Sequence, residues 1–244
     1  MKARIVALLF ALWVCPAFAA QDPVFAKANT DFAAGRFAEA IKGYEQLVAE
    51  GKSSATLFYD LGNAYYRSDD FGKAILQYER ALALEPHHAE AEANLRLARE
   101  QARALEMHTP PYDRFISFAT VNGYIIAAAV AFWLAAFGIA AAFFARRKSI
   151  ARVALILCAL LILAGSAIAV YLRETGPRGA HLAIVTAKNA EARLAAADTA
   201  GSMLALPPGS EVQVLSTRGD WLYALLPNEL HGWLRANTVE PVRL

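Results

Sequence analysis

At residues 69–86 the chain reads DDFGKAILQYERALALEP, and a similar stretch, GRFAEAIKGYEQLVAEGK, lies 34 residues earlier at 35–52. In the later copy Ala74 and Tyr78 are spaced as on one face of a helix, and Pro86 ends the run because proline cannot continue a helix. Repeats of this length, each containing a pair of helices, stack so that every unit covers the apolar face of its neighbour. We therefore expect this part of the chain to be an all-α array.

The two units resemble the tetratricopeptide repeat family. The second unit, 55–88, has the family's signature residues in place, namely Phe58, Leu61, Gly62, Tyr65, Ala74, Tyr78, Ala81 and Pro86. The first unit, 21–54, departs at three signature positions, where it has Ala28, Asp31 and Lys52. A further helix over 89–105 is expected to cap the stack. The resemblance implies a repeat array over 21–105 whose signature residues form a core.

In this family the first helix of each unit forms a concave face that binds ligands. The resemblance places the candidate groove residues Thr56, Tyr59, Asn63, Tyr66 and Asn94 on that face. Asn63 and Asn94 match positions at which some members hydrogen-bond a ligand's backbone or terminal carboxylate. The lysines expected beside them are absent, so we expect an extended or helical protein segment to bind through aromatic and amide groups. The alternative, that the two asparagines only join neighbouring helices, stays open.

Two apolar runs, 121–144 and 153–172, contain no Asp, Glu, Lys or Arg. At about 1.5 Å per residue each is long enough for a hydrocarbon core of about 30 Å. The turn between them, 145–152, carries the topology determinants Arg146, Arg147, Lys148 and Arg152. Because basic residues concentrate in short cytoplasmic loops, we expect two transmembrane helices with a cytosolic turn. Both flanking regions would then lie on the periplasmic side of a bacterial inner membrane.

The N-terminus agrees with this orientation. Lys2 and Arg4 precede a short apolar run, and Ala17 and Ala19 are the small residues that signal peptidase needs. A cleaved signal peptide over 1–19 is therefore expected. The alternative is an uncleaved anchor helix.

After the second apolar run the composition changes to alternating strands. Residues 181–244 resemble the SH3-like (SH3b) barrels of bacterial cell-envelope proteins, and the segments that carry the resemblance are 183–186, Arg193, 208–214, 219–221 and 232–234. The resemblance implies a small all-β barrel over 181–244. A linker over 173–180 is expected before it, and a linker and interfacial segment over 106–120 is expected between the repeat array and the first apolar run. Trp221 and Tyr223 are its candidate binding surface, because aromatic faces suit peptides and glycans. Packing of the small core remains the alternative for Trp221, and Trp233 is assigned to packing.

Composition excludes several classes of function. The formal net charge is +2, and no basic stripe exists outside the turn, so nucleic acid is not an expected partner. No metal-binding, phosphate-binding or nucleophile motif is present, and the five histidines are scattered (His87, His88, His108, His181 and His231). We therefore expect neither an enzyme nor a cofactor.

The order of these parts resembles the aerotolerance-operon (Bat) membrane proteins of the BatE type. This resemblance implies a multidomain membrane protein that acts as a non-enzymatic scaffold, binds membrane and periplasmic proteins of an envelope complex, and is linked to aerotolerance or stress. The alternative is a cell-wall sensor or tether that binds peptidoglycan through the SH3-like domain.

Overall fold

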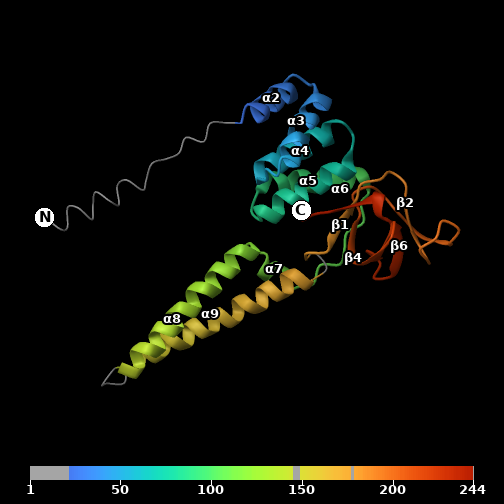
Figure 1. The fold of residues 1–244 in the computed structure, drawn as a ribbon. Helices are drawn as coiled ribbons and strands as arrows, with labels where there is room; N and C mark the ends of the chain where they lie inside the picture. Colours follow the sequence, from blue (N-terminus) through green and yellow to red (C-terminus); the bar gives the residue numbers. More distant parts are fainter. Residues whose placement is uncertain (1–21, 145–148, 177–178, 244) are drawn as a thin grey trace.

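The computed structural model describes residues 22–144, 149–176 and 179–243. Figure 1 shows a helical array, a sheet beside it, and a pair of long helices that extends away from both. The expected signal peptide over 1–19 lies outside the described residues, as do Arg146, Arg147 and Lys148.

The array consists of five helices: α2 (Pro23–Ala33), α3 (Phe37–Ala49), α4 (Ala55–Arg67), α5 (Phe71–Leu84) and α6 (Ala89–Ala102). Polar side chains cap the N-termini of several of these helices. The Asp22 carboxylate accepts from the Val24 N–H, and the Ser54 hydroxyl accepts from the Leu57 N–H, so otherwise unpaired N–H groups at the helix starts are satisfied. These local signals explain where α2 and α4, the first helices of the two units, begin.

The core of the array is built from the signature residues. Tyr44 and Tyr78 are fully buried and occupy equivalent places in the two units. Gly62 allows α4 and α5 to approach, because a Cβ atom there would lie 2.7 Å from a ring carbon of Tyr78. The same close approach explains why this position needs glycine.

Two helices, α8 (Val121–Phe144) and α9 (Ile150–Thr175), are long and apolar enough to cross a membrane. They pack through small buried residues (Ala131, Ala135, Gly138, Ala159, Ser166 and Ala169), while bulky apolar side chains point outward. The second helix extends beyond the expected 153–172, so Arg152 lies in its first turn. A short helix, α7 (Asp113–Ile116), precedes α8.

The C-terminal part is a seven-stranded antiparallel sheet in the order β3-β2-β6-β5-β4-β1-β7. Its strands are β1 (Leu182–Val185), β2 (Ala190–Arg193), β3 (Ser202–Leu206), β4 (Glu211–Arg218), β5 (Trp221–Leu225), β6 (His231–Arg235) and β7 (Val239–Pro241), with a 3-10 turn, η1 (Ala236–Thr238), before the last. No pairing within the described residues joins β3 to β7. The sheet is therefore open, and a closed barrel is not confirmed.

The sheet packs directly on the array. Leu182 and Ile184 of β1 belong to the same buried cluster as Ile75 of α5. Gly209 has a φ of +85°, and a Cβ atom there would lie 2.1 Å from the Ile75 Cδ1 atom. Both the backbone conformation and the lack of space therefore require glycine at this position. This contact is made by α5, the second helix of its unit.

Candidate functional site: the groove of the helical array

The first helices of the array, α2, α4 and α6, line a cavity of about 240 Å³. Its walls are formed by Phe32, Asn63, Tyr66, Arg67, Asn94 and Leu97. The structure therefore brings three of the five expected groove residues together at this cavity. Tyr59 lies next to it, whereas Thr56 is exposed and does not line it.

Asn63 joins three helices through hydrogen bonds. Its Oδ1 atom accepts from the Tyr78 hydroxyl at 2.8 Å and from the Asn94 Nδ2 atom at 2.9 Å. The first unit repeats half of this arrangement, since the Tyr44 hydroxyl donates to the Asn29 Oδ1 atom at 2.6 Å. The asparagines thus join neighbouring helices, which is the alternative role that the sequence left open.

The same two asparagines keep one polar atom each for a ligand. Within the described residues, Asn63 Nδ2 and Asn94 Oδ1 have no hydrogen-bond partner, and neither atom is fully buried. The first is a donor and the second an acceptor. A peptide backbone in the groove offers the complementary carbonyl and N–H groups.

Apolar and basic groups flank these amides. Tyr66 is half-buried with its ring 5.4 Å from that of Phe71, and Leu97 is exposed. The Arg67 guanidinium lies 5.0 Å from the Phe37 ring centroid. The groove can therefore hold a large apolar side chain beside a positive charge.

Three of the lining residues, Phe32, Arg67 and Leu97, are absent from the sequence-based site. The repeat spacing could have found two of them. Phe32 precedes Tyr66 by 34 residues, and Leu97 follows Asn63 by the same interval. Arg67 has no equivalent signal, because only the fold shows that its side chain reaches this cavity.

One carboxyl on α4 has an unusual environment. Burial raises the pKa of Asp60 to about 6, and the charge of His88 opposes this shift. Asp60 lies one turn before Asn63 on the same helix. Desolvation therefore makes its charged form unfavourable in the folded chain.

The sheet carries an aromatic cluster of its own. Trp221 is buried, with the Arg235 guanidinium 4.6 Å from its ring centroid. Tyr223 stands opposite Trp233 on the neighbouring strand, and both are half-buried, with ring centroids 5.0 Å apart. The Tyr223 ring also stacks on His231. Trp221 thus packs, whereas Trp233, which we expected only to pack, shares an accessible cluster with Tyr223.

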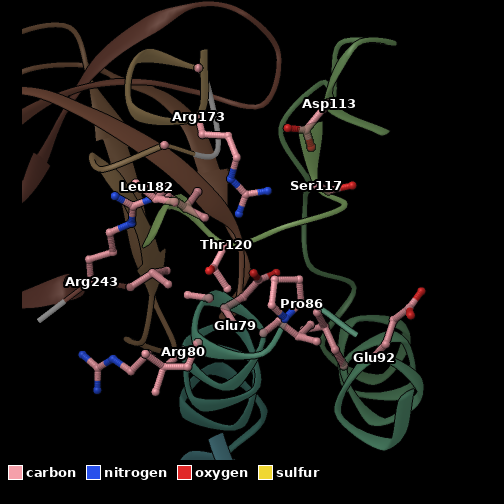
Figure 2. A pocket seen from close by; sticks show the side chains of 18 of the residues that line it. Glu79, Arg80, Pro86, Glu92, Asp113, Ser117, Thr120, Arg173, Leu182 and Arg243 are labelled. Atoms are coloured by element: carbon pink, nitrogen blue, oxygen red, sulfur yellow. The ribbon is translucent and has the colours of Figure 1, made fainter. Parts of the chain in front are cut away.

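A larger cavity, of about 1030 Å³, lies between the array, the segment before α8, the end of α9 and the C-terminal segment. Figure 2 shows Glu79 and Arg80 of α5 on one side of it and Arg173 of α9 on another. Many of its charges are paired: Arg99 contacts Glu79 at 2.5 Å and Glu106 at 3.0 Å, and Arg243 contacts Glu174 at 2.6 Å. Within the described residues no cluster of His, Cys, Asp or Glu is placed to hold a metal ion.

Comparison with known proteins identifies the array. Residues 25–89 and 59–110 match the tetratricopeptide repeat family. This match confirms the prediction of such repeats, and it covers the array and the start of the following linker. No curated protein matches the chain.

Proposed function

We propose that this chain is a non-catalytic, membrane-anchored scaffold that binds an extended segment of a partner protein in the groove of its helical array. The observation that carries the proposal is the pair of accessible atoms, Asn63 Nδ2 and Asn94 Oδ1, on the floor of this groove. They suit one carbonyl and one N–H of a peptide backbone. Tetratricopeptide repeats generally bind protein partners, which supports this class of ligand.

The walls of the groove indicate which side chains the partner segment carries. Phe32, Tyr66 and Leu97 surround a space suited to one large apolar residue. Arg67 favours an acidic residue next to it, since opposite charges attract across a partly desolvated interface. The partner is therefore a segment with adjacent apolar and acidic residues.

The proposal also places α8 and α9 across a membrane. Their length, lack of charge and outward-pointing bulky residues support it. With the basic residues around 145–152 in the cytosol, the array and sheet lie on the periplasmic side of a bacterial inner membrane. Anchoring then raises the effective concentration of the groove toward partners in the same membrane. The resemblance to Bat proteins of the BatE type suggests an envelope complex linked to aerotolerance or stress.

A photo-activatable amino acid at Leu97 tests the groove in intact membranes. We expect a discrete adduct with one protein, which disappears when Tyr66→Ala and Arg67→Ala are added. The matched control places the same probe at Leu194, which is exposed on the sheet. Identical adducts from both positions, or an adduct insensitive to the two alanine substitutions, would contradict groove binding.

The aromatic cluster of the sheet favours a second candidate, a cell-wall tether. Tyr223 and Trp233 form an accessible cross-strand pair, and aromatic faces bind sugar rings and peptides. Peptidoglycan fragments would then bind here and change the Trp233 fluorescence. A titration of the full chain that leaves the emission unchanged, with Tyr223→Ala as the comparison, would remove this candidate.

A further inference from the structure

The short segment between the array and α8 has two unlike sides. Phe115 and Phe118 are 79% and 76% exposed, although both are large and apolar. Tyr112, Asp113 and Ser117 of the same segment line the 1030 Å³ cavity instead. We refer to residues 112–118 as the aromatic strip. No described part of the chain buries the side chains of these two phenylalanines.

The position of the aromatic strip indicates what covers these rings. It comes directly before α8, and Figure 1 shows α7 at the end of the long helix pair that faces the array and sheet. The strip is held there, since Arg173 of α9 donates to the Ile116 carbonyl at 3.4 Å. Where α8 enters a bilayer, the strip lies at the level of the lipid headgroups. Aromatic side chains are enriched at this level.

We propose that the aromatic strip is a lipid-binding surface, with Phe115 and Phe118 inserted at the boundary between headgroups and acyl chains. Continuity with the apolar surface of α8 favours lipid over a protein partner, because the exposed rings adjoin a helix whose outward side chains are themselves apolar. The inference rests on the membrane anchoring proposed above.

The aromatic strip also connects the array to the bilayer. The Nε2 atom of His87, which follows α5, lies 2.8 Å from the Phe118 carbonyl oxygen, and the two rings are 6.0 Å apart. Phe118, one of the two residues that we propose to enter the lipid, therefore also contacts the array. This contact sets the height of the groove above the membrane surface, so the groove meets partner segments that lie close to the bilayer.

Fluorescence quenching by brominated lipids tests the inference on the full chain in vesicles. Phe115→Trp and Phe118→Trp are made separately, each compared with its parent by difference. Because both sites are exposed, the indole has room in either variant. We expect bromines near the headgroup end of the acyl chain to quench the new tryptophan about twofold more than bromines near the chain end. Leu194→Trp, exposed on the sheet, is the control and should not be quenched.

The native Trp133 separates this inference from the proposed anchoring. Trp133 lies near the middle of α8 and is exposed, so deep bromines should quench it in a spanning helix. If Trp133 is quenched but the new tryptophan at 115, at 118 or at both positions is not, the lipid-binding strip is overturned and the anchoring stays in place. Absence of quenching at all three positions overturns the anchoring itself, and the inference with it.

Discussion

Replacing Arg99 with methionine is expected to loosen the sheet from the array. Arg99 of α6 contacts Glu79 of α5 at 2.5 Å and also contacts Glu211 of β4. The side chains of Glu79 and Glu211 are only 8% and 1% exposed. The Glu211 Oε2 atom also accepts from the Met107 N–H at 2.9 Å. The Arg99 guanidinium therefore bridges two buried carboxylates from separate parts of the fold.

The magnitude follows from burial. Removing one partner of a buried ion pair leaves an uncompensated charge, which destabilises a protein by about 3–5 kcal/mol. Glu79 and Glu211 keep other interactions after the substitution, among them the bond from the Met107 N–H to Glu211, so we expect the lower end, about 3 kcal/mol. The third contact, with Glu106, adds little because that carboxylate is exposed.

Urea unfolding of the full chain in detergent, followed by fluorescence of the buried Trp221, measures this loss. Arg96→Met is the matched control, since Arg96 is exposed on the same helix and forms no ion pair with the described residues; it should change stability by less than about 0.5 kcal/mol. Combining Arg99→Met with Glu79→Gln and Glu211→Gln should recover most of the loss, because both side chains that Arg99 contacted are then neutral. Equal midpoints for Arg99→Met and Arg96→Met would refute the reasoning.

Three further predictions concern the array, each measured by unfolding of the full chain. Asn63→Ala leaves the buried Tyr78 hydroxyl without its acceptor and should cost about 1–3 kcal/mol, whereas Thr56→Ala, at an exposed site, should be near neutral; equal effects would exclude the hydrogen-bonded role. Gly62→Ala places a Cβ atom 2.7 Å from the fully buried Tyr78 ring and should destabilise by about 1–3 kcal/mol, so an unchanged midpoint would show that α5 can shift. Burial raises the folded-state pKa of Asp60 from 3.8 to about 6. Between these two pH values the folded chain keeps a proton that the unfolded chain releases. The free energy of unfolding therefore falls as the pH rises from 3.8 to about 6. Asp60→Asn should therefore stabilise the chain by about 1 kcal/mol above pH 6, allowing for solvent screening, and should have no effect near pH 4; a gain that is independent of pH would contradict this.

The sequence predicted the elements whose signals are local. The 34-residue spacing and the signature residues around Gly62 and Tyr78 indicated a tetratricopeptide array, because each unit must present the same apolar face to its neighbour. The absence of charge over 121–144 predicted a long apolar helix with the bounds that the structure has. The alternation around Val212 indicated strands, although it could not show whether the sheet closes.

The groove was predicted only in part. Tyr66, Asn63 and Asn94 line it as expected, yet local spacing could not show which atoms of the asparagines are already bonded. That depends on Tyr78, which reaches Asn63 from the neighbouring helix. Whether a hydrogen bond forms between two helices depends on differences of a few tenths of an ångström in how they pack. Sequence periodicity does not record such differences.

The sequence alone thus determined that the chain contains a helical repeat array, two long apolar helices and a region of strands, because helical and strand periodicities arise from residues close together in the chain. Only the tertiary structure decided how the parts are joined. Arg99 reaches Glu211 across 112 residues, and Gly209 fits against Ile75. Burial selects such partners by shape and charge after the elements have formed, so no local pattern records them, and the array and sheet are joined by contacts that neither part shows by itself.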